Sequence, residues 1–338
     1  MVSGGNGQGK TNLVEAIGWL ATLDSFRGAP PDALVRSGAE QAVVRAAGSR
    51  GGRDLLIEGT IPLRGRTRVQ INRQALRRSR DLLGALRVSV FSPDDLVIVK
   101  GGPGERRRYL DELLVGCHPK WDAVRADVER ILRQRTTLLK QAGGRLSTEI
   151  ALTLDVWDAK LASSGTALAE GRAELIAGLG PAVSMAYRDL AGPIPCDVEL
   201  AYHAPWLSEG LAAALAAART DDVRRGLSTV GPHRDDLVIS LNGLPSRTHA
   251  SQGEQRCLAL SLRLGGHGVV TIEAGDDPVL LLDDVFSELD PERSSALLAH
   301  LPPGQALLTT AGPLPAGVEP AAVVEVCNGQ AMTRSPHP

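Results

Sequence analysis

A glycine-rich run at the start of the chain constrains its fold more than any other feature. It fits the pattern G-x-x-x-x-G-K-[ST] and consists of Gly4, Gly5, Asn6, Gly7, Gln8, Gly9, Lys10 and Thr11. In this pattern backbone N–H groups turn toward phosphate oxygens, the lysine reaches the β- and γ-phosphates, and the hydroxyl holds Mg²⁺. Apolar residues recur at helical spacing from Thr11 to Leu23, so the loop opens a helix. We therefore predict an α/β nucleotide-binding fold with ATP and Mg²⁺ as cofactors.

A continuous apolar run far downstream predicts the metal-binding side of the same site. Residues 279–282 are followed directly by Asp283 and Asp284. Buried parallel strands are typically such uninterrupted runs, and nucleotides bind at the carboxyl ends of strands in open α/β sheets. We expect Asp283 to hold Mg²⁺ through water or Thr11, and Asp284 to act as the catalytic residue that orients or deprotonates the attacking water. The alternative is that Asp284 merely caps the strand end.

A third motif lies upstream of that strand, at the start of an apolar-faced helix. Its residues are Ser251, Gln252, Gly253, Glu254 and Gln255. Such a helix N-terminus binds anions. However, the helix that follows the glycine-rich loop (the P-loop) already contacts one side of the γ-phosphate in the predicted site. The second anion site therefore makes most sense in trans, across a dimer. The alternative is a capping box in which Ser251 and Glu254 only cap the helix.

The order of these motifs resembles that of ABC-type ATPases. The third motif is similar to their signature loop, and Ser287 and Asp290, after the aspartate strand, lie in a stretch similar to their D-loop. Taken alone, Asp290 before Pro291 is equally typical of a helix N-cap with proline at the first helical position. Taken together and in this order, the motifs predict an ABC-type ATPase.

Strand and helix patterns alternate along the rest of the chain. Short strands are predicted at residues 41–46, 55–61 and 66–72, the last two forming a hairpin. Amphipathic patterns then predict long helices, including two separate ones at residues 150–168 and 173–190.

The helical patterns divide the chain into two predicted lobes. Residues 1–100 and 229–338 form a P-loop ATPase lobe that is split in sequence, and residues 101–228 form a helical insertion lobe. Residues 306–310 are expected to be the last core strand, and residues 336–338 a frayed tail.

Charge and cysteine usage narrow the partners and the compartment. The formal net charge is -2, so a nucleic-acid partner would need local basic patches. Arginine-rich stretches occur at residues 64–80, 106–108 and 130–140, although a solvated face is the alternative for each. The four cysteines are scattered without metal-ligand spacing, and no apolar stretch approaches the ~18 residues of a membrane span. We predict a cytoplasmic protein with no membrane partner.

Several stretches together resemble the RecF family of recombination-mediator proteins. They span nearly the whole chain, at residues 5–17, 91–96, 100–111, 132–135, 231–237, 251–256 and 280–290. The combination of GPHRDDL at 231–237 with FSPDDL at 91–96 makes the resemblance specific. It implies an SMC-like ATPase head without a coiled coil, with the mixed sheet and helical lobe of that class.

The resemblance also implies a function. RecF proteins dimerise on ATP, bind single-stranded DNA and gapped duplex, and with RecO and RecR assist RecA loading and SOS induction. Hydrolysis would be slow and would release the DNA. Basic residues become candidate contacts to DNA phosphates, namely Arg73, Arg77, Arg78, Arg106, Arg107 and Arg108. The family motif at His233, Arg234, Asp235 and Asp236 implies a role near the nucleotide or at the lobe junction, with a salt-bridged turn as the alternative.

The sequence departs from the expected pattern at three places. Thr309 and Thr310 stand near the switch histidine of many ABC-type ATPases, and Asp284 stands where they usually have glutamate. Both departures fit weak hydrolysis better than rapid turnover. RecF proteins have strands before the P-loop, whereas only three residues precede Gly4, fewer than the about 5–6 of a typical strand. We therefore expect the N-terminal strands to be missing.

Two alternative functions stay open at this point. Without the leading strands, the chain could be a hydrolysis-deficient relic that binds nucleotide or DNA but does not turn over. A nucleotide-binding subunit of an ABC transporter is the other alternative, against which the long insertion and the FSPDDL stretch argue.

Overall fold

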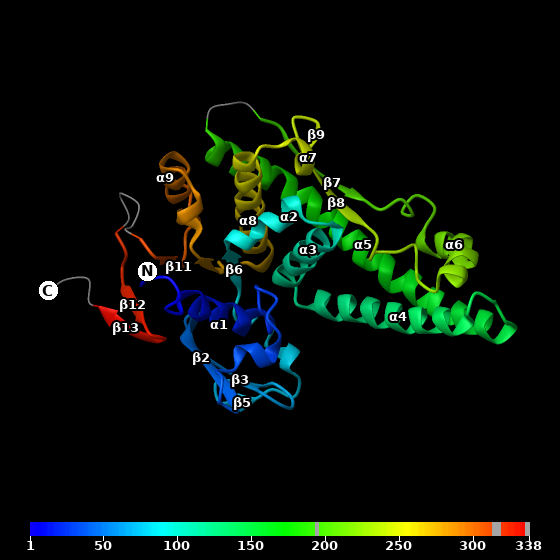
Figure 1. Ribbon diagram of the computed structural model, residues 1–338, viewed down its shortest axis with the longest axis horizontal. Helices are drawn as coiled ribbons and strands as arrows, with labels where there is room; N and C mark the ends of the chain where they lie inside the picture. The colour runs from blue at the N-terminus through cyan, green and yellow to red at the C-terminus, as the bar shows by residue number, and fades with distance from the viewer. Residues whose placement is uncertain (193–195, 313–318, 335–338) are drawn as a thin grey trace. The chain divides into compact units, whose positions relative to one another are not determined.

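The computed structural model divides the chain into two compact units (Figure 1). The described residues are 1–192, 196–312 and 319–334, so the predicted tail at 336–338 lies outside them. The first unit contains Met1–Asp95 and Val270–Pro338, and the second contains Leu96–Val269. Residues 229–269 thus belong to the second unit, whereas the predicted division placed them in the ATPase lobe.

The first unit is built on a six-stranded sheet that is parallel except at one edge. In spatial order its strands are β13 (Gln330–Arg334), β12 (Val323–Cys327), β1 (Val2–Ser3), β11 (Ala306–Thr310), β10 (Val279–Leu282) and β6 (Val88–Phe91). Only β13 runs antiparallel to its neighbour. The mixed sheet is confirmed, but the expectation that β11 ends the core is wrong, because β12 and β13 follow it.

The strand that leads into the P-loop is present, although it has only two residues. β1 lies between β11 and β12 and pairs parallel with both, with Val2 opposite Thr309 and Val324. The Met1 ammonium donates to Ala322 O at 2.7 Å, and Val324 N donates to Met1 O at 2.8 Å. The expectation that the strand directly before the P-loop is missing is therefore wrong. Two residues are enough for a central strand here because they pair with a neighbouring strand on each side.

A second, antiparallel sheet of the first unit has the order β2-β3-β4-β5. Its strands are β2 (Gln41–Arg50), β3 (Arg53–Pro62), β4 (Arg68–Ile71) and β5 (Gln74–Ala75). The predicted hairpin between the second and third strand regions is confirmed by the pairing of β3 with β4. The helical elements of this unit are α1 (Lys10–Thr22), α9 (Pro291–Ala299) and the 3-10 turns η1 (Pro31–Leu34), η2 (Ser79–Leu82), η3 (Pro93–Asp95) and η4 (Val285–Glu288).

The P-loop helix α1 is anchored on this second sheet through its apolar face. Trp19 and Leu20 are buried in one cluster with Ile57, Ile61 and other side chains of the sheet. Trp19 packs so closely on Gly59 that a Cβ there would lie 2.3 Å from its ring. The helix that presents the P-loop therefore has a rigid base.

The second unit is mostly helical, with one small antiparallel sheet. Its helices are α2 (Leu96–Lys100), α3 (Pro103–Cys117), α4 (Lys120–Ala142), α5 (Thr148–Ala191), α6 (Leu211–Arg225), α7 (Ser246–His249) and α8 (Gln252–Ala274), of which the last residues belong to the first unit. The sheet has the order β7 (Val198–His203), β8 (Asp236–Leu241) and β9 (Leu244–Pro245). Among the described residues, no helix has the length and apolar character needed to cross a bilayer.

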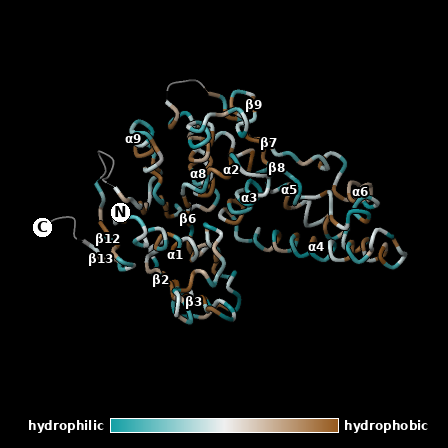
Figure 2. Tube along the Cα trace, viewed as in Figure 1, coloured by the Kyte–Doolittle hydropathy of each residue, from teal (hydrophilic) through white to brown (hydrophobic). Residues whose placement is uncertain are grey.

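Helix α5 corrects the prediction of two separate helices at residues 150–168 and 173–190. It runs unbroken through the residues between them and even through Pro181. Hydrophilic and hydrophobic residues alternate along α4 and α5, as expected for helices with one buried stripe (Figure 2). At Gly171 the absence of a side chain lets the Trp121 ring of α4 approach to where a Cβ would be 2.4 Å away. Packing against α4 thus keeps α5 helical at the residues where its apolar pattern weakens.

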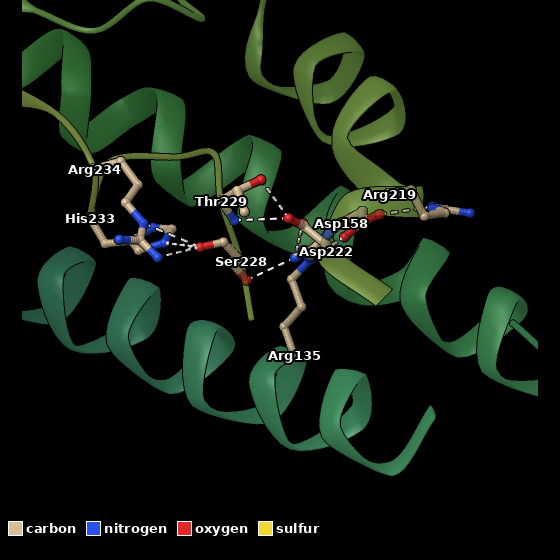
Figure 3. A network of polar contacts seen from close by, with 8 residues as sticks. All are labelled: Arg135, Asp158, Arg219, Asp222, Ser228, Thr229, His233 and Arg234. Atoms are coloured by element: carbon tan, nitrogen blue, oxygen red, sulfur yellow. Dashed lines mark hydrogen bonds and ion pairs between the residues drawn. The ribbon is translucent and has the colours of Figure 1, made fainter. Parts of the chain in front are cut away.

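A buried ion-pair network joins α4, α5 and α6 (Figure 3). Its centre is Arg135, which is fully buried and donates to Asp158 Oδ1 and to Asp222 Oδ2, both at 2.6 Å. Arg135 also donates to Ser228 Oγ at 2.7 Å, while Arg219 neutralises the other oxygen of Asp158 at 2.8 Å. A fully buried charge is tolerated only when paired in this way.

The same network extends into the segment after α6, which carries His233. The carbonyl oxygen of Ser228 accepts from His233 Nε2 at 3.0 Å and from Arg234 Nη2 at 3.0 Å (Figure 3). Burial lowers the pKa of His233 to about 4, with the charge of Arg234 acting in the same direction. His233 is therefore neutral near pH 7, with the proton on Nε2.

Two further ion pairs, and a hydrogen bond that one of them makes, fasten the start of β8 and the segment before it to helices α3 and α5. Arg172 pairs with both carboxylate oxygens of Asp111 at 2.8 Å and donates to Pro232 O at 2.8 Å. Arg106 pairs with both oxygens of Asp236, at 2.7 and 2.8 Å. These contacts explain why the residues from 229 onward join the helical unit.

Asp235, the residue before β8, is fully buried. Its carboxylate accepts from Tyr202 Oη at 2.6 Å and from Trp206 Nε1 at 2.8 Å. Burial raises the pKa of Asp235, against the lowering effect of these two hydrogen bonds. Of the two alternatives that the sequence left open for residues 233–236, the contacts of the stretch 231–237 match the salt-bridged turn.

Candidate ATP-binding site

The parallel strands of the first unit bring the P-loop and the aspartate motif together at one edge of the sheet. β1 ends at Ser3 immediately before Gly4, β10 ends before Asp283, and β11 ends at Thr310. Because these strands are parallel, their carboxyl ends lie at the same edge, where nucleotides bind in open α/β sheets. Two motifs more than 250 residues apart thus form one site.

The backbone of the P-loop requires glycine at its two ends. A Cβ on Gly4 would lie 2.3 Å from Val326 O of β12, so no side chain fits there. Gly9 has φ 105° and caps α1 without a side chain that could satisfy the first N–H groups of the helix. Those N–H groups and the helix dipole are free to face an anion, which fits a triphosphate.

Lys10 places its ammonium group over the loop. Nζ donates to Gly4 O at 2.8 Å and to Gly5 O at 2.9 Å, and the residue is 7% exposed. A cation held in this position can pair with the oxygens of a phosphate that lies in the loop. The predicted contact of Lys10 with the β- and γ-phosphates stays a prediction.

Thr11 and Asp283 are in direct contact, as a shared magnesium site requires. Thr11 Oγ1 donates to Asp283 Oδ1 at 3.1 Å, and Asp283 is buried. A hydroxyl and a carboxylate are oxygen ligands of the kind that Mg²⁺ binds alongside nucleotide phosphates. When bound, Mg²⁺ would neutralise phosphate charge here, and these two residues would hold it.

Asp284, the candidate catalytic residue, adopts the left-handed conformation with φ 51°. Its backbone N–H donates to Thr309 Oγ1 at 2.9 Å, and its carbonyl accepts from Ser287 Oγ at 2.8 Å. Among the described residues its carboxylate accepts no hydrogen bond. A non-glycine residue in this region is strained, and such strain is typical of functional sites. The free carboxylate is consistent with the predicted task of orienting water.

Thr309 has a role that sequence reasoning missed. The sequence placed it near a switch histidine, but its hydroxyl donates to Asp283 Oδ1 at 2.8 Å and accepts from Asp284 N. The side chain is buried, with 1% exposed. Thr309 thus fixes the carboxylate of one aspartate and the backbone of the next, as groups behind metal ligands do.

We expect Thr309→Val to lower the ATPase rate by about 10- to 100-fold and to raise the Mg²⁺ concentration needed for half-maximal rate. Valine keeps the shape but not the hydroxyl that orients Asp283. Thr309→Ser keeps the hydroxyl and should retain most activity. The measurement is the ATPase rate as a function of Mg²⁺. A Thr309→Val variant with an unchanged Mg²⁺ dependence would show that Thr309 only packs.

The turn between β12 and β13 supports the P-loop from outside, and this too was not predicted. Asn328 N donates to Gln8 Oε1 at 2.7 Å, and Gly329 N donates to Gln8 O at 3.1 Å. Both turn residues have positive φ, 50° and 74°, as in a two-residue type I′ hairpin. The Asn-Gly pair at 328–329 was the available signal, because this dipeptide is the strongest short-range indicator of such hairpins.

The predicted signature loop and D-loop form helix caps in this chain. Ser251 Oγ accepts from Glu254 N at 3.3 Å and Glu254 Oε2 accepts from Ser251 N at 2.7 Å, which is a capping box at α8. Gln255 is buried and donates to the carbonyl of Ser246. Asp290 caps α9 by accepting from Arg293 N at 2.8 Å. These contacts fix the local structure of both motifs. Their predicted part in an ATP site shared with a second chain stays a prediction.

The structure separates the candidate DNA contacts into two groups. Arg106 is buried in its ion pair with Asp236, so the prediction that it contacts phosphate is corrected. Arg107 donates to Asp235 O at 2.7 Å, and burial lowers its pKa. Arg108 is exposed and pairs with Glu105 one helical turn away. The other group, Arg73, Arg77 and Arg78, is exposed around β5.

The sheet, the P-loop and the aspartate strand together define an ATPase head of the RecF, RecN and SMC type. The family model described as the RecF/RecN/SMC N terminal domain matches residues 1–306. The chain is 46% identical to a DNA replication and repair protein RecF of Kineococcus radiotolerans over 90% of its length and 85% of the relative. The same identity relates it to the RecF protein of Streptomyces avermitilis, over 91% of this chain and 86% of that one. The chain belongs to the RecF family.

Solved structures show the same fold. A recombination mediator protein RecF of the RecFOR pathway, solved with ATP, aligns with a TM-score of 0.90 and 30% identity over 99% of this chain and 91% of that chain. A second structure of such a protein, with ATPrS, gives 0.89 over 98% and 91%. An SMC head bound to a winged-helix domain of ScpA aligns at 0.58 with 15% identity, which shows the shared fold alone.

Proposed function

We propose that this chain is an ATP-dependent DNA-binding protein of recombinational repair with slow, DNA-stimulated ATP hydrolysis. The observation that carries the proposal is the contact of Thr11 with Asp283 beside a buried Lys10, in a chain of the RecF family. This arrangement binds a triphosphate and its Mg²⁺. The related structures bear ATP in their names, which supports ATP as the nucleotide.

The finer steps of the proposal follow the family. ATP joins two chains, so that Ser251 of each signature loop completes the site on the other chain. The dimer binds single-stranded DNA and gapped duplex, and it works in the cytoplasm with RecO- and RecR-like mediators to load RecA and to induce the SOS response. The RecFOR pathway named for the related structures supports these partners.

A hydrolysis-deficient binder is the second candidate function. It is favoured by aspartate rather than glutamate at 284 and by Thr309 and Thr310 near the position of the switch histidine, since both departures fit weak hydrolysis. The transporter-subunit alternative has lost its support, because RecF proteins match the chain over 90% of its length.

The test is DNA binding by fluorescence anisotropy, with and without Mg-ATP, combined with phosphate release. We expect the affinity for a gapped duplex to rise at least about tenfold with ATP, which corresponds to about 1.4 kcal/mol of coupling. DNA should in turn raise the rate of phosphate release. Tight ATP binding without phosphate release would favour the second candidate, and DNA affinity independent of ATP would contradict both.

A further inference from the structure

Besides Gly51–Gly52, which has φ 56° and 74°, three two-residue hairpin turns among the described residues have the same backbone conformation, with positive φ at both positions. They are Asn328–Gly329 with φ 50° and 74°, Asn242–Gly243 with φ 52° and 75°, and Asn72–Arg73 with φ 48° and 67°. The first two use the Asn-Gly pair that such turns favour. The third, between β4 and β5, has arginine where the others have glycine.

The conformation of Arg73 is imposed on it by its neighbours. Asn72 fixes the turn on β3, because Asn72 N donates to Leu56 O at 2.8 Å and Asn72 Oδ1 accepts from Leu56 N at 2.8 Å. In the left-handed region the Cβ of an L residue lies too close to the next carbonyl, a cost that glycine avoids. Among the described residues the Arg73 side chain has no salt bridge or hydrogen bond. Nothing within the described chain therefore offsets the conformational cost of arginine here.

The surroundings of Arg73 are strongly basic. Residues 64–80 contain seven arginines and no acidic residue, and all seven arginines are exposed. Four of them lie between the loop before β4 and the turn after it, and the other three, Arg77, Arg78 and Arg80, come after β5. We call these seven residues the arginine strip: Arg64, Arg66, Arg68, Arg73, Arg77, Arg78 and Arg80.

The chemistry of the strip fits phosphates rather than bases. No Phe, Tyr, Trp or His occurs in residues 27–90, so this part of the sequence contributes no ring on which an unpaired base could stack. Duplex DNA presents about one negative charge per 1.7 Å of helix axis, which suits a row of guanidinium groups. The strip is thus better matched to the backbone of a duplex than to a single strand.

We infer that the arginine strip binds the phosphate backbone of duplex DNA, and that Arg73 occupies its strained turn for this contact. The inference rests on the proposed function and names the surface and the residue that serve it. Charges at the edge strand β5 could instead only prevent pairing with another sheet. That role would not need an arginine in the left-handed position, because the flanking arginines already supply edge charge.

The experiment compares stability and duplex binding in four proteins: the unaltered chain, Arg73→Gly, Arg73→Lys and Gly243→Arg. Each is measured by thermal melting, and by anisotropy with duplex and with single-stranded DNA over a range of salt, in the presence of ATP. Gly243→Arg is a matched control, since a Cβ at Gly243 meets no atom within 4 Å and the change imposes only the conformational cost.

Arg73→Gly is expected to move stability and binding in opposite directions. Its melting temperature should rise by about 2 °C because the strain is relieved. Its duplex affinity should fall about fivefold, and the slope of log K against log salt should become shallower by about 1. Arg73→Lys should bind like the unaltered chain without the gain in melting temperature. Gly243→Arg should melt at a lower temperature with unchanged binding.

Three results would overturn the inference. If Arg73→Gly has unchanged duplex affinity and an unchanged salt slope, the strip only protects the sheet edge. If Arg73→Gly loses as much affinity for single-stranded DNA as for duplex, the strip is not specific for duplex. A melting temperature that does not rise would remove the conformational argument. If the unaltered chain binds no DNA in the presence of ATP, the proposed function fails as well. The first three results, in contrast, leave the proposed function in place and overturn only the inference about the strip.

Discussion

Replacing Lys10 by Ala is expected to lower the ATPase rate by at least about 100-fold and to remove the effect of ATP on DNA binding. The Lys10 ammonium is the only side-chain cation that the P-loop motif itself supplies, and it is held over the loop by the carbonyls of Gly4 and Gly5. Without it, the charge that develops on the transferred phosphoryl group loses its nearest partner.

The change should leave the fold intact, because the loop is held by other contacts. Gln8 is bound by the backbone of the β12–β13 turn, and Gly4 packs on Val326. Phosphate release and ATP binding by calorimetry, with circular dichroism as the check on folding, measure the effect. Lys160→Ala, at an exposed lysine of α5, is the control and should be active. A folded Lys10→Ala protein with normal turnover would show that the P-loop is not the catalytic site.

Arg135→Met is expected to cause the largest loss of stability, about 3–5 kcal/mol in the free energy of unfolding. Asp158 keeps Arg219 as a partner in this variant, but the fully buried Asp222 keeps only its hydrogen bonds from Thr229. Removing one partner of a buried pair leaves an uncompensated carboxylate, which costs far more than the pair contributes.

Urea unfolding followed by circular dichroism measures this loss, with two matched comparisons. Arg130→Met removes an arginine of the same helix that is half exposed and pairs with Asp127, and it should change stability by less than about 0.5 kcal/mol. Asp222→Asn in the Arg135→Met background should recover part of the loss, because it removes the unpaired charge. Equal effects of Arg135→Met and Arg130→Met would mean that the network does not stabilise the unit.

Local patterns in the sequence were enough to predict which two motifs come together at the edge of the sheet. The P-loop and the apolar strand before Asp283 are contiguous motifs whose chemistry depends on neighbouring residues, and the sheet then brings them together. The contact of Thr11 with Asp283 was expected for the same reason. Thr309 could be located but not given its role, because its contacts depend on the register of β11 beside β10.

Features that depend on long-range packing were predicted less well. The segment before the P-loop was judged too short to be a strand, because typical strand lengths were the only guide. Its pairing with β11 on one side and β12 on the other cannot be read from the sequence. Helix α5 was divided, because the packing of Trp121 on Gly171 leaves no signal in the apolar spacing. Arg106 was taken for a surface residue, since a run of arginines does not reveal that Asp236 pairs with one of them.

The central claim is that each ATP site is completed by the signature loop of a second chain. Two variants that we expect to be inactive alone, Lys10→Ala and Ser251→Arg, test it most directly when they are mixed. Each homodimer carries one defect in both sites, whereas a mixed dimer carries both defects in one site and has the other site intact. With random exchange in an isologous dimer, the mixture should recover about a quarter of the normal ATPase activity. A mixture that stays as inactive as its components would contradict the account, because it would place both motifs in the same chain's site.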